Sequence, residues 1–255
     1  MYSKNPVRHT LTENLLVLER ELHHAGYPLI AGVDEAGRGP LAGPVVAAAV
    51  IFRQGTVIQG INDSKKLTPD TRERLFDDIF RQAFAIGIGL AGNTEIDAIN
   101  ILTATFLAMD RAIADLRQKP DLLLVDGNTF RPGPASFAVP WQTHIGGDGR
   151  VFSIAAASII AKVARDRLMT EYDREYPGFG FARHKGYGTR EHRDAIARLG
   201  ICPIHRRSFA ISGAESTTRG SIIAEEDDGE ESASKGSRGG VDCAPLPGTL
   251  RLSGS

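Results

Sequence analysis

The chain has 255 residues, of which 42% are hydrophobic and 24% charged, so it can fold as one large domain or two small ones with a complete core. Its two cysteines argue against a disulfide framework and a cysteine metal site. No apolar run is long enough to cross a membrane and no signal sequence is recognisable, so the protein is expected to be soluble and cytoplasmic. The net charge of −1 is unevenly distributed. Residues 212–255 hold eight acidic and four basic side chains, a net charge of −4, and residues 1–211 therefore have a net charge of +3. A mildly basic main part permits nucleic-acid binding without requiring it.

The first part of the chain is predicted to contain a packing helix and an antiparallel meander. Leucines recur at helical spacing through residues 10–25, and Gly26 ends that run. Apolar runs over residues 29–34, 45–52 and 56–61 predict three strands, and the short links between them favour antiparallel pairing.

A helix is expected over residues 69–84. Thr68 is a suitable N-cap and Pro69 suits the first helical position. Leu75, Ile79 and Phe80 are expected to face the core.

The rest of the chain alternates strands with helices. The predicted elements are a strand over 85–90, the longest helix over 94–118, strands over 122–127 and 137–145, and helices over 151–175 and 189–199. Residues 212–255 lack aromatic side chains and are rich in Ser, Gly, Glu and Asp, which is typical of a disordered tail. The expected division is a helical extension over 1–27, a main domain over 28–211 and this tail.

Two adjacent carboxylates, Asp34 and Glu35, stand between two apolar runs and beside a Gly-Arg-Gly turn. Because an unpaired buried charge is costly, such a pair needs a partner. A divalent metal is one explanation, and an ion pair with Arg38 is the other.

Further carboxylates stand where they could join this pair. Asp126 closes an apolar strand, at the end where α/β proteins place their sites, and Asp166 lies on a predicted helix. Oxygen ligands without a Cys or His cluster suit Mg²⁺ or Mn²⁺ better than Zn²⁺. Asp63 and Asp148 fall in loops, where capping or turn formation accounts for them.

Six ordered motifs together are more specific than any one of them. They are GVDEAGRGP (32–40), NDSKKL (62–67), VDG (125–127), SIAAASIIAKVARD (153–166), HKGYGT (184–189) and HRRSF (205–209). In this combination and order the chain resembles the bacterial type 2 ribonucleases H (ribonuclease HII) from about residue 28 to 210.

The resemblance implies a ribonuclease H-like α/β fold, with a mixed five-stranded sheet flanked by helices and a C-terminal helical region. It implies an endonuclease, acting as a monomer, that cuts the RNA strand of RNA–DNA hybrids and single ribonucleotides embedded in duplex DNA. The products would carry 5′-phosphate and 3′-hydroxyl ends. The nucleophile would be water activated by divalent metal, Mg²⁺ or Mn²⁺, with two ions during catalysis.

Matching motif positions imply roles for individual residues. The metal ligands and catalytic carboxylates would be Asp34, Glu35, Asp126 and Asp166. The backbone of Gly37, Arg38 and Gly39 and the hydroxyl of Tyr187 would read the ribose 2′-OH, the group that distinguishes RNA from DNA. Contacts to backbone phosphates are expected from Lys65, Lys66, Lys162, Lys185, Arg206 and Arg207. His184 and His205 would be structural or would contact phosphate.

Two alternatives stay open on sequence. A type 3 ribonuclease H has a different turn and an additional N-terminal domain, for which residues 1–27 are too few. A catalytically inactive hybrid-binding module would use the carboxylates only to shape a groove.

Overall fold

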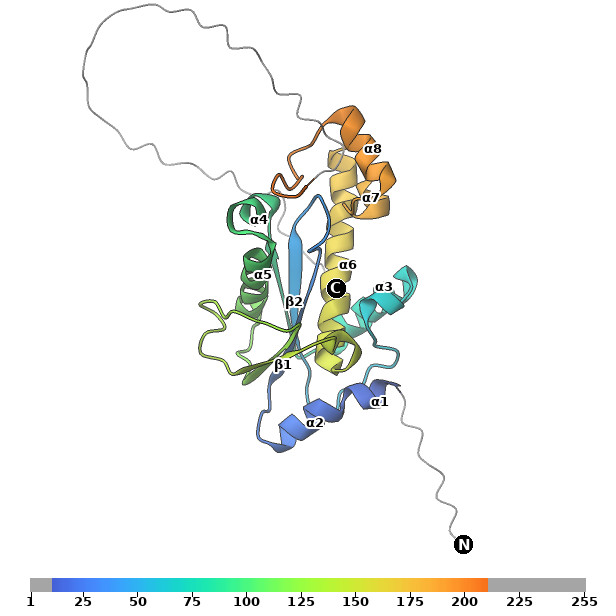
Figure 1. Ribbon diagram of the computed structural model, residues 1–255. Helices are drawn as coiled ribbons and strands as arrows, with labels where there is room; N and C mark the ends of the chain where they lie inside the picture. Colours follow the sequence, from blue (N-terminus) through green and yellow to red (C-terminus); the bar gives the residue numbers. More distant parts are fainter. Residues whose placement is uncertain (1–10, 211–255) are drawn as a thin grey trace, which may run out of the picture. The chain divides into compact units, whose positions relative to one another are not determined.

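The computed structural model describes residues 11–210, which form a five-stranded mixed sheet covered by helices on both faces (Figure 1). The strands are β1 (Ile30–Ala36), β2 (Val45–Ile51), β3 (Ala85–Ala91), β4 (Leu122–Asp126) and β5 (Trp141–His144). Their order is β3-β2-β1-β4-β5, with antiparallel pairing of β1 to β2 and of β2 to β3, and parallel pairing of β1 to β4 and of β4 to β5. The expected ribonuclease H-like sheet is therefore confirmed.

The strand predicted over residues 56–61 is wrong. This segment forms turns, and β3 takes the third place in the meander. Ile58 and Ile61 are buried from the loop, so their apolar character reflects anchoring to the core rather than strand pairing.

Helices α4 (Asn93–Ile99) and α5 (Ile101–Asp115) cover one face of the sheet (Figure 1). The single helix predicted over residues 94–118 is thus divided. The division occurs at Asn100, which has a φ of 65° and whose side chain caps α5 by accepting a hydrogen bond from the N–H of Thr103.

Helices α3 (Pro69–Gln82) and α6 (Phe152–Glu175) cover the other face, and α6 is the longest helix in the described part of the chain. Phe76 of α3 is buried, whereas Phe80, predicted to face inward, is partly exposed and packs against Phe76. Helix α6 passes very close to β1, because a Cβ at Gly32 would stand 2.2 Å from the carbonyl carbon of Ser153. Only glycine permits this approach, which brings α6 alongside the strand that carries Asp34.

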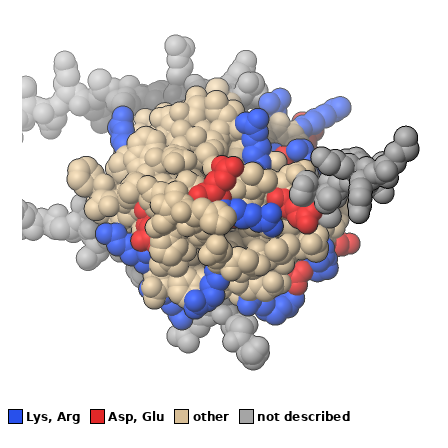
Figure 2. Space-filling model, turned by 90° about the horizontal axis from the view of Figure 1, so that it is seen from below, with Lys and Arg blue, Asp and Glu red and all other residues tan. Residues whose placement is uncertain are grey.

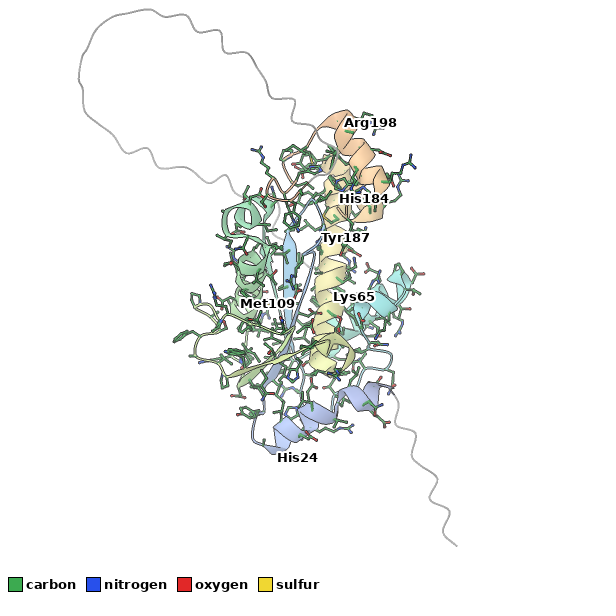
Figure 3. The ribbon with its side chains drawn as sticks, in the orientation of Figure 1. His24, Lys65, Met109, His184, Tyr187 and Arg198 are labelled. Atoms are coloured by element: carbon green, nitrogen blue, oxygen red, sulfur yellow. The ribbon has the colours of Figure 1, made fainter. Side chains whose placement is uncertain are left out.

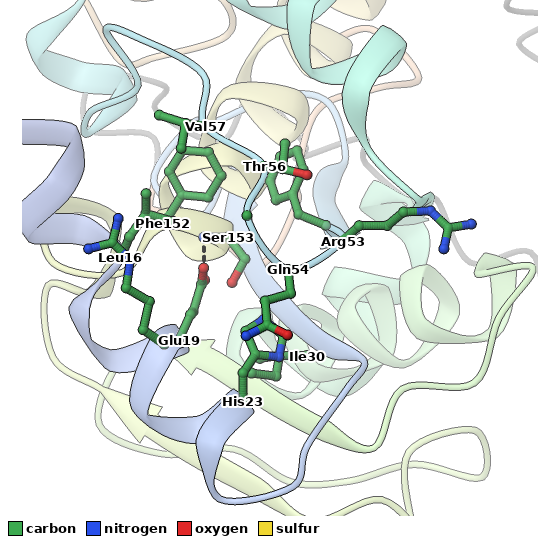
Figure 4. A pocket seen from close by; sticks show the side chains of 13 residues that line it. Leu16, Glu19, His23, Ile30, Arg53, Gln54, Thr56, Val57, Phe152 and Ser153 are labelled. Carbon is green, nitrogen blue, oxygen red and sulfur yellow. Dashed lines mark hydrogen bonds between the residues drawn. The ribbon is translucent and has the colours of Figure 1, made fainter.

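The N-terminal segment forms two short helices, α1 (Leu11–Leu15) and α2 (Val17–His24), where one helix over 10–25 is predicted. Its role in packing is confirmed, because Leu18 and Leu22 lie against the core residues of β1 and β4. The carboxylate of Glu19 is buried and accepts a hydrogen bond of 2.8 Å from the N–H of Ser153, at the start of α6 (Figure 4). Glu19 thereby caps a helix that has no side-chain cap of its own.

The chain after α6 continues with α7 (Phe181–His184) and α8 (Arg190–Leu199), which pack around a smaller apolar cluster beside α6. Two 3₁₀ turns matter for the site, η1 (Ser64–Lys66) and η2 (Gly147–Gly149). The tail predicted over residues 212–255 lies outside the described residues. No helix between residues 11 and 210 is long and apolar enough to span a membrane. Seen from below, Lys and Arg are interspersed with Asp and Glu, so this face has no patch of a single sign (Figure 2).

Candidate active site

Asp34, Glu35 and Asp126 meet at one edge of the sheet. Asp34 and Glu35 lie near the end of β1, and Asp126 is the last residue of β4, the parallel neighbour of β1. The register pairs Val33 with Val125, so the carboxylates that follow these two residues come side by side. Carboxyl ends of adjacent parallel strands produce this convergence, as the position of Asp126 in the sequence suggested.

Asp148 is a fourth member of this cluster, which sequence reasoning assigned to turn formation. It lies in η2, is only 7% exposed, and accepts a hydrogen bond of 3.1 Å from Nζ of Lys65. The N–H of the preceding Gly147 donates to Oδ1 of Asp126 at 2.7 Å, which fixes η2 against the end of β4. The negative charge of Asp148 raises the pKa of both Asp34 and Asp126. The sequence does hold a signal for Asp148. It is flanked by glycines in the run Gly146–Gly149, and glycines let the backbone bring a carboxylate close to the end of a strand.

The structure does not place Asp166 among the residues that line the acidic cleft, and its expected role as a metal ligand stays a prediction. Its carboxylate lies 2.7 Å from Nζ of Lys162, one helical turn earlier on α6. Asp166 lines an adjoining groove together with Arg167 and Lys185, whereas Lys162 lines both that groove and the acidic cleft. The local pair with Lys162 accounts for the charge of Asp166.

The acidic cluster carries more negative charge than its surroundings neutralise. Burial, together with the charges of Glu35 and Asp126, raises the pKa of Asp34 well above its usual value. Burial also raises the pKa of Glu35, although Arg38 opposes the shift from 3.3 Å. Burial raises the pKa of Asp126 against the opposing hydrogen bond from Gly147. Such a cluster calls for a bound cation.

The donor set fits a hard divalent cation. Among the described residues no group of three or more His, Cys, Asp or Glu side chains is arranged so that it could hold a metal ion by itself. Mg²⁺ rarely uses a cage of protein side chains alone, because it keeps several waters and takes one or two carboxylates plus phosphate oxygens. Carboxylates at the wall of an open cleft match that preference.

The Gly37-Arg38-Gly39 turn and Tyr187 form the wall of the same cleft, which has a volume of about 240 Å³. A Cβ built on Gly39 would stand 3.7 Å from Cε1 of Tyr187, so the turn faces the ring directly. The ring is 45% exposed, as expected from its place between two glycines. Tyr187 and Lys65, both labelled in Figure 3, line this cleft together. The ion pair of Arg38 with Glu35 also exists, so this alternative and the acidic cluster occur together.

The basic residues expected at phosphates fall into different environments. Lys65 and Lys162 line the cleft, and Lys185 lines the adjoining groove and donates to the hydroxyl of Thr170. Lys66 is mostly exposed near Asp63, and Arg207 is exposed next to Asp97, to which its N–H donates.

Arg206 does not fit the expected phosphate contact. It is 0% exposed, and its guanidinium donates to backbone carbonyls inside the protein. His184 and His205 are buried as well. His184 bonds to the carbonyl of Phe179, and His205 to the N–H of Cys202. Both histidines are therefore structural in their contacts.

Comparison with known proteins gives a consistent result. A family model described as Ribonuclease HII matches residues 31–212. The ribonuclease HII of Geobacter sulfurreducens is 59% identical over 184 residues, which cover 72% of this chain and 83% of the relative. That of Acetivibrio thermocellus is 54% identical over 195 residues, covering 76% of this chain and 75% of the relative.

Solved structures agree with this fold. The ribonuclease H2 of Pyrococcus horikoshii OT3 matches with a TM-score of 0.59 at 30% identity, covering 72% of this chain and 94% of that one. The ribonuclease HII of Archaeoglobus fulgidus, solved in a complex with PCNA, matches with a TM-score of 0.60 at 27% identity, covering 71% and 95%. The family model spans most of the described residues and includes both the acidic cluster and the Gly-Arg-Gly turn. The chain belongs to the ribonuclease HII family.

Proposed function

We propose that Asp34, Glu35, Asp126 and Asp148 form the catalytic centre through which this ribonuclease HII cuts nucleic acid. As a member of its family, the protein is a metal-dependent endonuclease that hydrolyses the RNA strand of RNA–DNA hybrids. The observation that supports the residue assignment most strongly is the convergence of Asp34, Glu35 and Asp126 in a cleft beside the Gly-Arg-Gly turn. Asp148 lies next to this lining, because it is bonded to Lys65 and follows Gly147, whose N–H donates to Asp126.

The carboxylates would hold Mg²⁺ or Mn²⁺, two ions in the reacting complex. The bound cations would lower the pKa of the attacking water and neutralise charge on the phosphate and the leaving oxygen. The protein contributes the positions of the acidic oxygens. The N–H of Gly147 orients the carboxylate of Asp126, and Nζ of Lys65 orients that of Asp148.

Ribose would be recognised on the opposite wall of the cleft. The N–H groups of Arg38 and Gly39 donate to no acceptor within the described part of the chain, so they are available to a sugar hydroxyl. Tyr187 supplies a hydroxyl and a half-exposed ring beside Gly39. A 2′-OH bound there marks ribose, which supports cutting at a single ribonucleotide embedded in DNA as well as in hybrids.

Phosphate contacts would come from Lys65 and Lys162 at the cleft and Lys185 at the adjoining groove. The exposed side chains of Lys66 and Arg207 would add contacts farther along the surface. These contacts position a duplex without reading its sequence. Because the proposed groups of the site all come from one chain, we propose that the protein acts as a monomer, in the cytoplasm where its nucleic-acid substrates lie.

A DNA duplex with one embedded ribonucleotide tests this function. The wild type is expected to cut it in Mg²⁺ or Mn²⁺, leaving 5′-phosphate and 3′-hydroxyl ends. Asp126→Asn should slow cutting by about 100-fold or more, as the loss of a few kcal/mol of transition-state stabilisation implies. A binding module without catalysis would instead retain the duplex and leave it intact in both metals. Equal cutting by Asp126→Asn would remove Asp126 from the catalytic centre.

A further inference from the structure

Two buried arginines stand behind the Gly-Arg-Gly turn. Arg206, which follows α8, donates from Nη2 to the carbonyl oxygen of Gly37 at 2.6 Å and from Nη1 to that of Arg38 at 2.9 Å. Its Nε donates to the carbonyl of Gly43 at 2.9 Å. All three nitrogens of one guanidinium are thus used on the backbone of this turn and the loop that follows it.

Arg165 of α6 continues the same arrangement. It is 1% exposed and donates to the carbonyls of Pro44 at 3.0 Å, Ala42 at 3.2 Å and Lys185 at 3.0 Å. Lys185 has a φ of 51°, a left-handed conformation that is uncommon for a residue with a side chain. Arg165 therefore connects the loop behind the turn to the strained backbone that leads into the Tyr187 loop.

The geometry of the peptide group gives these bonds a consequence in the cleft. In a trans peptide the N–H points opposite to the C=O. The carbonyls of Gly37 and Arg38 point at Arg206, so the N–H groups of the same two peptides, those of Arg38 and Gly39, point away from it. Neither of these N–H groups has an acceptor among the described residues.

Packing alone does not explain two guanidinium groups at this place. Desolvation lowers the pKa of Arg206 to about 9 and that of Arg165 to about 10, which reflects the cost of burying these cations. Apolar side chains of similar volume generally fill such a space at lower cost. A guanidinium offers what they lack, because its planar fork donates in several fixed directions at once. The two buried guanidinium groups therefore hold the backbone carbonyls of the turn and its neighbouring loops in fixed orientations.

We propose that Arg206 and Arg165 are positioning residues that set the enzyme's selectivity for ribose, by holding the Gly-Arg-Gly turn and the Tyr187 loop in one fixed relation. This inference rests on the proposed function of the turn in reading the 2′-OH. Arg206 acts on the two carbonyls of the turn itself, and Arg165 links the loop after the turn to the segment before Tyr187. Arg206 is 0% exposed, and Arg165, at the base of the cleft, is 1% exposed, so both act through the backbone that they hold.

The close fit around Gly37 supports the same conclusion. Gly37 has a φ of 100°, and a Cβ there would stand 2.0 Å from Nε of Arg165. The side chain of Arg165 therefore occupies the space that any larger residue at position 37 would need. The packing of the turn against Arg165 can therefore be disturbed either by a substitution of Gly37 or by a substitution of the arginine.

The test compares Arg206→Lys with the wild type on two duplexes, one with an embedded ribonucleotide and one with a 2′-fluoro-2′-deoxynucleotide at the same position. Lysine keeps the charge but cannot reach three carbonyls. We expect kcat on the ribonucleotide to fall about tenfold with little change in KM, and the preference for ribose over the 2′-fluoro sugar to fall as well. Arg198→Lys is the matched control, because Arg198 is an exposed arginine that donates to the carbonyl of Gly178. It should change neither value.

Thermal unfolding and circular dichroism check that each variant is folded. Should Arg206→Lys not fold, Gly37→Ala disturbs the packing of the turn against the other arginine, Arg165, and should lower the ribose preference in the same way. A folded Arg206→Lys that keeps both the rate and the preference of the wild type would overturn the positioning role while leaving the catalytic carboxylates in place. A wild type that cuts the 2′-fluoro duplex as fast as the ribonucleotide would overturn both the reading of the 2′-OH by the turn and the inference built on it.

Discussion

Nζ of Lys65 lies 3.1 Å from Oδ2 of Asp148, although 83 residues separate them in the sequence. The bond joins η1, which follows β2, to η2, which precedes α6. It brings a cation from one loop to the acidic cluster and fixes the orientation of the carboxylate that sequence patterns had not assigned to the cluster.

Replacing Lys65 by methionine is expected to slow cleavage about tenfold, because Asp148 loses its hydrogen-bond donor and the cluster loses a nearby cation. The lysine side chain is 77% exposed, so the free energy of unfolding should change by less than about 1 kcal/mol. Cleavage kinetics and urea denaturation measure the two effects separately. Lys119→Met, at an exposed position, is the control. A Lys65→Met variant with the wild-type rate would show that the bond to Asp148 is not needed.

The acidic cluster is expected to lower the stability of the metal-free protein. The folded-state pKa of Asp34 is raised, so its contribution to stability is present at low pH and is lost as the pH rises through that pKa. At neutral pH, Asp34→Asn should therefore raise the melting temperature of the metal-free protein by about 2–4 °C while abolishing cleavage. Calorimetry in a chelator checks this. A lower melting temperature would contradict the account of the cluster as under-neutralised.

A chain of neutral histidines supports the Tyr187 loop. The partners assign one tautomer to each ring: the N–H of Cys202 donates to His205 Nδ1, His205 Nε2 donates to His192 Nε2, and His192 Nδ1 donates to the carbonyl of Tyr187. Desolvation is the main cause that lowers the pKa of His192 to about 4, and the neighbouring His184 lowers it further.

Protonation of His192 would remove the acceptor in this chain, so acid should destabilise the fold. With a depressed folded pKa, the contribution of His192 is complete above about pH 6.5 and declines as the pH falls toward about 4. Thermal unfolding between pH 7 and pH 4 should show this decline, and His192→Asn should be less stable at pH 7 and less sensitive to pH. An identical pH profile for that variant would exclude His192 as the cause.

Glu19 should stabilise the protein through its hydrogen bond to Ser153 rather than through its charge. Burial raises the pKa of Glu19, so ionisation weakens its contribution as the pH rises through the folded value. Glu19→Gln keeps an acceptor without the charge and should be at least as stable as the wild type at neutral pH. Glu19→Leu leaves the N–H of Ser153 without its partner and should cost about 1–3 kcal/mol in urea denaturation. Equal stability of the two variants would contradict this capping role.

Local patterns predicted the sheet and most helices because those elements follow from nearby residues. Thr68 with Pro69 marked the start of α3, and the apolar run before Asp126 marked β4. The errors came from contacts between distant segments. Ile58 lies in a loop but is buried, so its apolar character was mistaken for that of a strand. The left-handed conformation of Asn100 divides a segment whose sequence has a continuous helical pattern.

Residues of the candidate site were also predictable where local patterns place them, and not where contacts between distant segments do. Asp34, Glu35 and Asp126 could be placed from strand ends, because the register of parallel strands brings them together. Asp148 could not, since only the packing of η2 against β4 makes it a neighbour of Asp126. Arg206 carries a basic side chain in a basic motif, and nothing in the sequence indicates that its charge points inward.

The most direct test of the four-carboxylate centre compares Asp148→Asn with Asp166→Asn in cleavage of a duplex that contains one ribonucleotide. Both carboxylates are bonded to a lysine, so each substitution removes the same chemical group from a similar pair. We predict that Asp148→Asn loses activity by about 100-fold or more, like Asp126→Asn, while Asp166→Asn stays within about tenfold of the wild type. Retained activity in Asp148→Asn together with loss in Asp166→Asn would contradict the assignment.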